Sequence, residues 1–414
     1  MAAGIQDSIK TLMASKKIKA ALDFLRSDHE QRVAQMKEIA LTFGETGKEP
    51  LARSPMYHKM LVREGAKECR TDSLGNVSGY VYGSGGKDVT VLFEAHLDTV
   101  FPEGTPLAIR EEGSRLFCPG IGDDAGGLTL NLSLLRAIRH AELVPVTALM
   151  VAGTACEEAT GNFNGMRKLF DDNPAIAASV SIDGGGNERV CHRGVGTKRT
   201  EFIFRGPGGH SWSNYGIPMC MHAMCRAMSA VAAIDLPSDP KTTVNIGVVS
   251  GGDSAGAIAA EARVHVDMRS LEQAAMDALE KEVFSRVQTA VAMENRLRNQ
   301  PGVANVSVEA NSYADIPAAF TPENSVIVRT VFAASKALKL EADTSQTAST
   351  NANIPMSRGI PAVTLGYGGV STGVHSLGEC WDSADAYRAA QKALLVIFAL
   401  AGLDGVTEPL VGKP

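Results

Sequence analysis

Residues 89–100 have the sequence VTVLFEAHLDTV, in which an apolar run ends in a histidine and an aspartate. The run from Val89 to Ala95 predicts a buried β-strand, because β-branched and aromatic residues favour strands. His96 and Asp98 are two residues apart, so they lie on the same face of an extended chain. Imidazole suits zinc, and a histidine that binds a metal needs a partner that orients it. The stretch therefore indicates a strand that ends at a candidate metal site.

Other apolar segments of the chain are also followed by carboxylates or by a histidine. Strands are predicted at residues 146–152 and 178–182, and helices at residues 125–140 and 162–170. Strands that alternate with helices predict a largely parallel α/β sheet with helices on both faces. Ligands of such sheets bind beyond the carboxyl ends of the strands. The polar groups expected there are His96, Asp98, Asp123, Asp124, Glu157, Glu158, Asp183 and His375.

The pattern changes after Gly194 and returns near residue 326, which predicts an inserted domain. The middle of the chain favours a compact α+β unit, whereas a helix at 326–337 and a strand at 362–365 resume the first pattern. We therefore expect a catalytic metal-binding domain at residues 1–197 and 313–414, and an inserted domain at residues 198–312. Within the insertion, strands are predicted at 200–204, 243–249, 263–268 and 303–308, and helices at 219–233 and 271–293.

Composition narrows the class of protein. The 414 residues carry 40 Lys and Arg against 46 Asp and Glu, and 44% are hydrophobic, which is typical of a globular protein. No basic stripe or long apolar run stands out, so neither nucleic acid nor a membrane is an expected partner. The first twenty residues lack a signal-peptide pattern. Seven cysteines without a CxxC motif predict reduced thiols and a cytoplasmic protein.

Two histidines with several carboxylates suit a dinuclear hydrolytic site better than a structural zinc site, which favours cysteine. Two metal ions roughly 3.5–4 Å apart need a bridging carboxylate, terminal ligands and a water with a nearby base. The adjacent Glu157 and Glu158 can supply a base and a ligand if their side chains point to different places. Neighbours diverge in helices and strands, so this division of roles predicts an irregular turn, with which Gly161 is consistent.

Taken together, these motifs give the sequence a clear resemblance to a known family. The chain resembles the M20 family of zinc aminoacylases and peptidases, and its branch most similar to tripeptide aminopeptidases (peptidase T). The motifs follow the family's order and span most of the chain. They are His96–Val100, Gly120–Gly127, Glu157–Glu158, Ser181–Gly185, Gly208–Ser211, Asp267–Arg269 and His375–Ser376.

The resemblance implies two zinc ions per chain, with cobalt or manganese as possible replacements. Asp123 would bridge the two ions. The remaining ligands implied are His96 and Asp183 for one ion, and Glu158 and His375 for the other.

The resemblance also implies catalytic and substrate-binding roles. Glu157 would be the general base, and Asp98 would orient His96. His210 in the inserted domain would stabilise the oxyanion, often across a dimer interface. Arg269 would pair with a substrate carboxylate, and Asn245 would contact the substrate.

The implied activity is hydrolysis of an amide bond in a short peptide or an N-acyl amino acid by a homodimer. Cleavage as an aminopeptidase, a carboxypeptidase or an aminoacylase stays open, and so does the substrate. Two alternatives are a deacylase of a non-peptide N-acyl compound and a catalytically silent metal- or peptide-binding homologue. The intact Glu157 and Asp98 argue against the silent homologue, because binding alone needs neither.

Several positions depart from the family or allow a different interpretation. Ala125 stands where the family often has lysine, and Asn351 stands at the acidic place of a Ser-x-Asp-Ala-like segment, which puts substrate preference in doubt. Cys156 could be a nucleophile, but no histidine lies near it in sequence. The glycines 184–186 suggest a phosphate cradle, but no lysine follows them as in a P-loop. Asp123 and Asp124 could be an N-cap pair of the following helix, which is compatible with a metal role because one carboxylate can cap while the other bridges.

Overall fold

The structure is a computed structural model that describes residues 2–413. The chain forms two compact units: residues 195–319 make up the second unit, and the described residues on either side make up the first. The predicted insertion at residues 198–312 lies within the second unit. Every helix in the described part of the chain is too short or too polar to span a bilayer.

A seven-stranded sheet with the order β1-β2-β6-β3-β7-β17-β8 forms the centre of the first unit. The pairs β3–β6, β3–β7 and β7–β17 are parallel, whereas the outer pairs are antiparallel. This arrangement confirms the mostly parallel α/β sheet. The strands are β1 (Lys67–Thr71), β2 (Val77–Val81), β3 (Thr90–His96), β6 (Ala148–Thr154), β7 (Ile176–Ile182), β8 (Val190–Cys191) and β17 (Ala362–Leu365).

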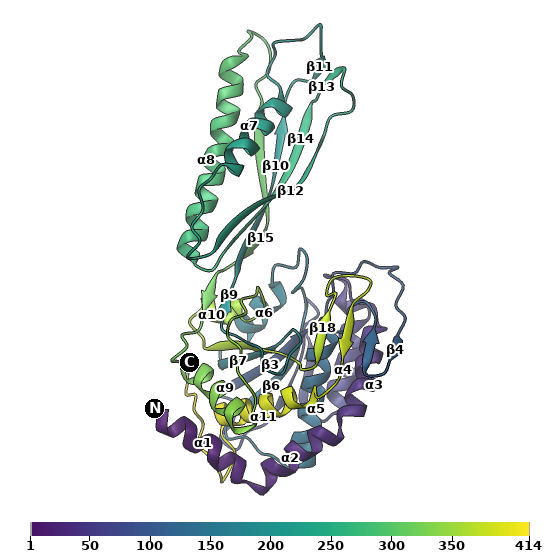
Figure 1. Cartoon of the computed structure of the whole chain (residues 1–414), viewed down its shortest axis with the longest axis vertical. Helices are drawn as coiled ribbons and strands as arrows, with labels where there is room; N and C mark the ends of the chain where they lie inside the picture. Colours follow the sequence, from purple (N-terminus) through teal and green to yellow (C-terminus); the bar gives the residue numbers. More distant parts are fainter. Residues whose placement is uncertain (1, 414) are drawn as a thin grey trace. The chain divides into compact units, whose positions relative to one another are not determined.

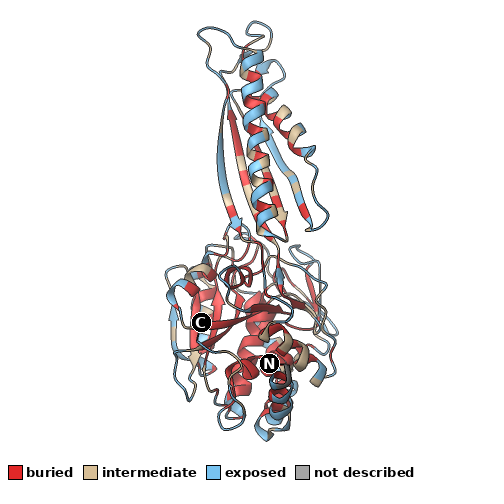
Figure 2. Cartoon of the chain, turned by 90° about the vertical axis from the view of Figure 1, so that its left-hand side faces the viewer, coloured by how far each residue is buried: buried red, intermediate tan, exposed pale blue. Residues whose placement is uncertain are grey.

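Helices flank this sheet (Figure 1). Two apolar helices, α5 (Ala125–His140) and α11 (Tyr387–Ala401), pack against β3 and β7, while α6 (Asn164–Asp172) packs against β6. The central strands and helices α5 and α11 are buried over most of their length (Figure 2). The other elements are α1 (Ala2–Ala14), α2 (Lys16–Ser27), α3 (His29–Ala40), η1 (Glu49–Leu51), α4 (Arg53–Arg63), α9 (Val326–Ala337), α10 (Asn353–Ser357), β4 (Arg110–Glu112), β5 (Arg115–Phe117), β9 (Arg193–Gly194), β16 (Ala319–Phe320), β18 (Val370–Thr372) and β19 (Cys380–Asp382).

The carboxyl ends of the three neighbouring parallel strands lie at one edge of the sheet. β3 ends at His96, β6 ends three residues before Glu157, and β7 ends directly before Asp183. Because β6, β3 and β7 are adjacent and parallel, the residues that follow them converge on one place. The sheet topology thereby assembles side chains that are far apart in sequence.

The second unit is a four-stranded antiparallel sheet with the order β12-β14-β10-β15. Along β14, buried residues alternate with partly exposed ones, so one face packs on α7 and α8 and the other carries charges. Its elements are β10 (Gly196–Arg205), β11 (Gly209–His210), α7 (Cys220–Ala232), β12 (Thr242–Gly251), β13 (Ala257–Ile258), β14 (Glu261–Ser270), α8 (Gln273–Leu297) and β15 (Ser307–Ile316).

The last strand of this unit differs from the prediction. The sequence predicts a strand at residues 303–308, but β15 spans Ser307–Ile316. The side chain of Asn295 in α8 hydrogen-bonds both the N–H and the C=O of Val306, at 2.8 and 2.9 Å. Val306 is therefore tied to the end of a helix, and pairing with β10 starts only after it.

Candidate metal centre

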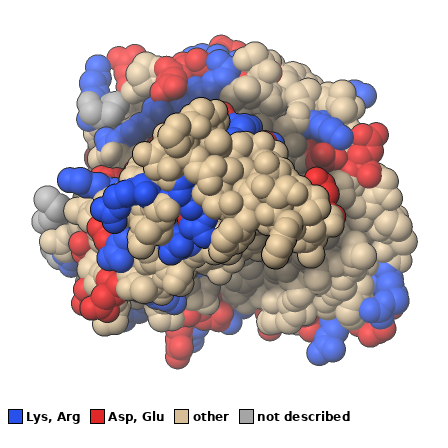
Figure 3. Space-filling view, turned by 90° about the horizontal axis from the view of Figure 1, so that it is seen from above, with Lys and Arg blue, Asp and Glu red and all other residues tan. Residues whose placement is uncertain are grey.

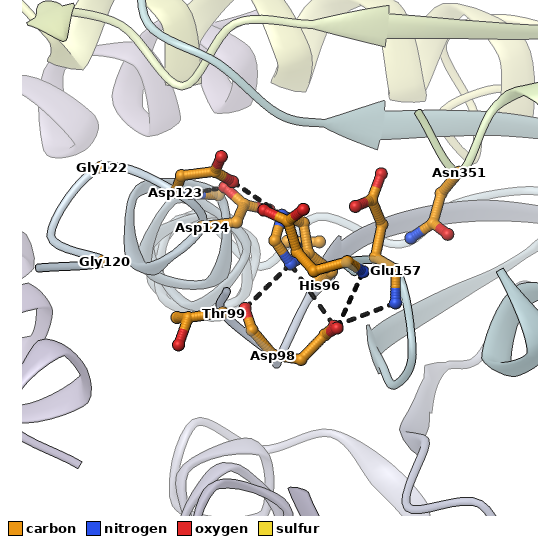
Figure 4. Close-up of polar contacts among 12 residues, drawn as sticks. His96, Asp98, Thr99, Gly120, Gly122, Asp123, Asp124, Glu157 and Asn351 are labelled. Carbon is orange, nitrogen blue, oxygen red and sulfur yellow. Dashed lines mark hydrogen bonds and ion pairs between the residues drawn. The ribbon is translucent and has the colours of Figure 1, made fainter. Parts of the chain in front are cut away.

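His96 is almost completely buried at the end of β3, with 2% of its surface exposed. Its Nε2 atom lies 2.8 Å from Oδ1 of Asp123. Its Nδ1 atom lies 3.0 Å from the backbone oxygen of Asp98 and 3.5 Å from Oδ1 of the same residue. The ring is thus held on the Asp98 side, and Nε2 faces the carboxylates (Figure 4).

Asp123 lies between two histidines. Its Oδ1 faces Nε2 of His96, and its Oδ2 lies 3.1 Å from Nε2 of His375. The loop that carries Asp123 is held by Glu379, whose buried carboxylate accepts the N–H groups of Gly120, Gly122 and Asp123 at 2.8, 2.8 and 3.0 Å. One carboxylate with its two oxygens turned to two imidazoles has the geometry of a bridging ligand.

Asp124 takes the role of a helix cap. Its Oδ1 accepts the N–H of Gly127 at 2.9 Å in the first turn of α5, which confirms the predicted cap. Its Oδ2 accepts the backbone N–H of His96 at 3.1 Å. The neighbouring aspartates therefore divide their functions: one fixes the helix and strand ends, and the other faces the histidines.

Glu157 and Glu158 lie in an irregular turn, as predicted. Cys156, Ala159 and Asn162 all have positive φ angles, of 60°, 50° and 56°. A β-carbon at position 161 would lie 2.4 Å from the carbonyl oxygen of Cys156, so only glycine fits there.

The carboxylate of Asp98 orders this turn. Its Oδ1 accepts the N–H of Glu157 at 3.1 Å, and its Oδ2 accepts the N–H of Glu158 at 2.8 Å. Asp98 is fully buried. It thus holds the backbone of both glutamates in addition to touching His96 (Figure 4).

Three groups of side chains bring their ligand atoms within 4.8 Å of one another. One group contains His96, Asp123 and Asp183, and a second contains Asp123, Glu158 and His375. In the second group, Nε2 of His375 lies 2.7 Å from Oε1 of Glu158. A third group combines His96 with both Glu157 and Glu158. Neutral imidazole and carboxylate ligands suit a divalent cation, and the shared Asp123 suits a pair of cations.

Crowding of these groups raises the pKa values of both glutamates and both histidines. Burial, together with the charge of Glu158, raises the pKa of Glu157 well above its usual range. Burial and the charge of Asp123 raise the pKa of Glu158 to about 7. Hydrogen bonds from the ring of His375 to the carboxylates of Asp123 and Glu158 raise its pKa to about 10. Burial acts to lower the pKa of His96, but its hydrogen bonds to Asp123 and Asp98 raise it overall. So many acidic groups in one dry place favour a bound cation.

The second unit holds His210, which is exposed in the short strand β11. Nδ1 of its ring accepts the backbone N–H groups of Trp212 and Ser213 at 3.2 and 3.3 Å. An imidazole nitrogen that accepts hydrogen bonds carries no proton, so in the neutral ring the proton is on Nε2. Nε2–H is therefore available as a hydrogen-bond donor.

Arg269 and Asn245 lie on β14 and β12 of the second unit. Nε of Arg269 donates to Oδ2 of Asp267 at 2.9 Å, and Arg199 donates to the other oxygen of Asp267 at 2.8 Å. Asn245 is exposed and pairs in register with Asp267. Arg269 thus already shares a carboxylate within its own unit.

The structure adds residues that local sequence did not indicate. Besides Glu379, the buried Arg53 donates to the backbone oxygens of Thr42 and Leu97 at 2.9 and 2.8 Å, which braces the segment between His96 and Asp98. Glu379 and Arg53 both bond to backbone groups distant in sequence, so no spacing pattern indicates these two residues.

The structure bears on one departure from the family pattern, Asn351, and on the alternative interpretation of Cys156 as a nucleophile. Asn351 is buried, and its side-chain amide donates to Oε2 of Glu94 at 3.0 Å and to Oγ1 of Thr154 at 2.8 Å. It is therefore part of a buried network beneath the strand ends. Burial raises the pKa of the Cys156 thiol to about 12, which keeps it neutral and argues against a nucleophile.

Comparison with known proteins agrees with this geometry. Residues 92–398 match the family model described as peptidase family M20/M25/M40. Carboxypeptidase G2 of Pseudomonas sp. (strain RS-16) is 24% identical over 220 residues, which cover 51% of this chain and 52% of that protein. The chain thus matches about half the length of this curated relative.

Solved structures share the fold. Aminopeptidase PepT from Bacillus cereus has a TM-score of 0.71 at 19% identity, over 89% of this chain and 98% of its own. A dinuclear metal-binding peptidase of the M20 family from Bacillus subtilis has a TM-score of 0.64 at 14% identity, over 91% and 99% of the two chains.

Proposed function

Because the chain belongs to peptidase family M20/M25/M40, we propose that it is a dinuclear metal-dependent hydrolase of an amide bond in a short peptide or an N-acyl amino acid. The observation that carries the proposal is the position of Asp123, whose two oxygens face His96 and His375. A single carboxylate whose two oxygens face two imidazoles is the arrangement that a bridging ligand of two cations needs.

The metal ligands would be those that the resemblance implies. His96, Asp123 and Asp183 would hold one ion, and Asp123, Glu158 and His375 the other. These residues fit a pair of cations, because each set offers three ligand atoms close together and Asp123 belongs to both sets. Zinc suits the histidines, while cobalt or manganese suits the many carboxylate oxygens. Bound ions would polarise the scissile carbonyl and lower the pKa of water.

Glu157 would be the general base. It shares an irregular turn with Glu158, whose Oε1 lies 2.7 Å from Nε2 of His375. The carboxylate of Glu157 belongs to the same cluster as His96 and Glu158, and its buried position raises its pKa. It would take a proton from the attacking water and pass that proton to the leaving amine.

Residues of the second unit would complete the substrate site. Nε2–H of His210 would donate to the oxyanion of the tetrahedral intermediate, since Nδ1 already accepts two backbone N–H groups. Arg269 and Asn245 would contact the substrate. The second unit would then act as a lid that excludes water during the reaction.

The second unit would also form a homodimer. β12 is an edge strand, and Val248 and Val249 on it are 52% and 55% exposed. Trp212 and Tyr215 are 85% and 72% exposed. Much of the face seen in Figure 3 carries no Lys, Arg, Asp or Glu side chains. Exposed apolar surface of this kind favours contact with a second protein chain.

We assign the protein to the cytoplasm on the basis of its thiols. All seven cysteines are free, and four of them are buried. Unpaired cysteines are typical of proteins that fold in a reducing compartment.

The experiment that tests the proposed activity compares the wild type with Glu157→Ala on tripeptides, dipeptides and N-acetyl amino acids. We expect turnover on at least one class, and its loss in Glu157→Ala with the metal retained. Glu341→Ala, which removes an exposed glutamate of the same unit, is the control and should keep full activity. Bound metal without turnover on any of these compounds would support the silent homologue. Turnover on non-peptide N-acyl compounds alone would support the deacylase.

A further inference from the structure

A cavity of about 600 Å³ lies in the second unit next to His210. Strand β11, which carries His210, pairs with β13, and His210 is opposite Ala257 in this pair (Figure 1). Ala257 lines the cavity, and so does Ser211, the residue after His210. Pockets that bind small molecules measure roughly 300–1,000 Å³, so this cavity has the size of a ligand site. It begins at residues that are direct neighbours of the candidate oxyanion donor.

Much of the wall of this cavity is apolar. Met219 and Ile258 line it with only 7% and 8% of their surfaces exposed, so they are recessed. Met221 and the backbone of Gly252 also line it, and a β-carbon at Gly252 would lie 3.2 Å from Cε of Met221. Methionine side chains adapt to ligands of different shapes. No lysine or arginine is among the described residues of the lining, so the cavity suits a hydrocarbon group better than an anion.

Hydrogen bonds fix the segments that surround the cavity. The N–H of Ser211 donates to the carbonyl oxygen of Gly256 at 3.0 Å, which joins the segment after β11 to the loop before β13. The N–H of Met219 donates to Oε1 of the fully buried Glu294 at 3.1 Å, which fixes the start of α7. A cavity that is formed before a ligand arrives lowers the entropic cost of binding.

The cavity differs from the edge strand that we assign to the homodimer. Val248 and Val249 of β12 are 52% and 55% exposed, whereas Met219 and Ile258 are nearly buried. An edge strand contacts another chain through its unpaired backbone groups, while small molecules bind in concave sites. The position beside His210 indicates which molecule occupies the cavity. It is the substrate, through the group next to the carbonyl that His210 would contact.

We propose that the cavity lined by Met219, Met221, Ala257 and Ile258 binds a hydrocarbon group that flanks the scissile amide, and that the enzyme therefore prefers substrates with a large apolar group there. This inference rests on the proposed hydrolase function and names the substrate class of that site. Either an amino-acid side chain or an acyl chain offers such a group. Burial of this group in the cavity would add binding energy and place the carbonyl beside His210.

The test measures kcat/KM for three series of substrates in which only a hydrocarbon group grows. The first series is Gly-Gly-Gly, Leu-Gly-Gly and Phe-Gly-Gly, and the second is the N-acetyl derivatives of glycine, leucine and phenylalanine. The third is N-acetyl-glycine, N-butanoyl-glycine and N-hexanoyl-glycine. In at least one series, we expect the wild type to favour the larger group about tenfold or more, as apolar pockets do. The series that responds identifies the group as the residue before the scissile amide, the residue after it, or the acyl chain.

Two variants connect this preference with the cavity. Ala257→Leu adds volume to an exposed position of the lining, and it should lower kcat/KM for the large substrates about tenfold more than for the small ones. Met221→Ala should weaken the preference, because apolar contact is lost. Ala292→Leu and Met293→Ala, at exposed positions of α8 in the same unit, are the matched controls and should leave the preference unchanged.

Other outcomes would overturn the inference. If Ala257→Leu and Met221→Ala keep the preference of the wild type, the apolar group binds elsewhere. If kcat/KM is equal within every series for the wild type, the hydrolase stands but the apolar site fails. If size-exclusion chromatography shows that the two variants dissociate a dimer while the preference is unchanged, the cavity binds a second copy of the chain and not the substrate.

Binding provides a readout that does not depend on turnover. If the wild type cleaves none of these compounds, the proposed function fails for them, and calorimetry then decides the inference. The compounds for calorimetry are N-acetyl-glycine, N-acetyl-leucine and N-hexanoyl-glycine. Tighter binding of a larger compound that is lost in Ala257→Leu supports the apolar site. Equal binding of the three compounds, or tighter binding that Ala257→Leu retains, contradicts it.

Discussion

Oδ1 of Asp98 accepts the backbone N–H of Glu157 at 3.1 Å, so the residue that steadies the first histidine also fixes the proposed base. The other oxygen accepts the N–H of Glu158 at 2.8 Å. The family resemblance assigns Asp98 only to His96. In this chain one carboxylate couples the end of β3 to the turn after β6, and the relative position of ligand and base depends on it.

Asp98→Asn should therefore impair catalysis beyond its effect on His96. An amide has one acceptor oxygen, so it can serve only one of the two glutamate N–H groups, and its own N–H groups would face the other. We expect kcat/KM to fall about ten- to a hundredfold at saturating metal. Steady-state kinetics and urea unfolding check this. Asp171→Asn, on the surface, is the control. An unchanged kcat/KM with reduced stability would limit Asp98 to a structural role.

The free energy of unfolding should depend on pH because the pKa of Lys392 is lowered in the folded protein. Burial lowers the pKa of this lysine to about 8, from an unfolded value near 10.5. Below pH 8 the side chain is charged in both states. Between about pH 8 and 10.5 the unfolded chain holds a proton that the folded chain has released, so the free energy of unfolding rises with pH in this window, by at most about 3 kcal/mol.

The comparison with Lys392→Met isolates this contribution. Urea unfolding of both proteins at several pH values between 7 and 10.5 gives the difference in unfolding free energy. That difference should shift in favour of the wild type as the pH rises, because methionine has no proton to release. A difference that stays constant, or that shifts toward the variant, would mean that Lys392 keeps an ordinary pKa in the folded protein.

The sheet, and the meeting of the candidate site residues at the carboxyl ends of its strands, could be predicted from the sequence. Both follow from apolar runs that end in polar residues. The apolar runs before His96 and Asp183 form parallel neighbouring strands, β3 and β7, so their carboxyl ends meet. The division of metal ligands came from the family resemblance, and the structure brings the same sets together.

Other parts depend on contacts that local pattern does not contain. Glu379 serves the N–H groups of Gly120 and Gly122, more than 250 residues away. Helices α1 and α2 were not predicted, although the buried Ile18, Ala21, Leu22 and Leu25 of α2 recur at helical spacing. The start of β15 depends on the side chain of Asn295. In the sequence, the glycine run that includes Gly184 suggests a phosphate cradle. In the structure, the backbone of Gly184 lies against the guanidinium group of Arg189.

His210→Ala should lower kcat without changing the metal content. A single donor to an oxyanion contributes about a hundredfold or more to kcat. His210 is exposed, so its replacement should leave the unfolding temperature nearly unchanged. His222→Ala, a partly exposed histidine of the same unit, is the matched control. Equal kcat values for His210→Ala and the wild type would remove His210 from the catalytic machinery.

The most direct test of the central claim is the metal content of the wild type, Asp123→Ala and His375→Ala, measured by elemental analysis after loading with zinc and removal of free metal. We expect about two ions per chain in the wild type. His375→Ala should retain about one ion, because only one set contains His375, whereas Asp123→Ala should lose both. One ion or none in the wild type, or equal metal content in the two variants, would contradict a dinuclear centre bridged by Asp123.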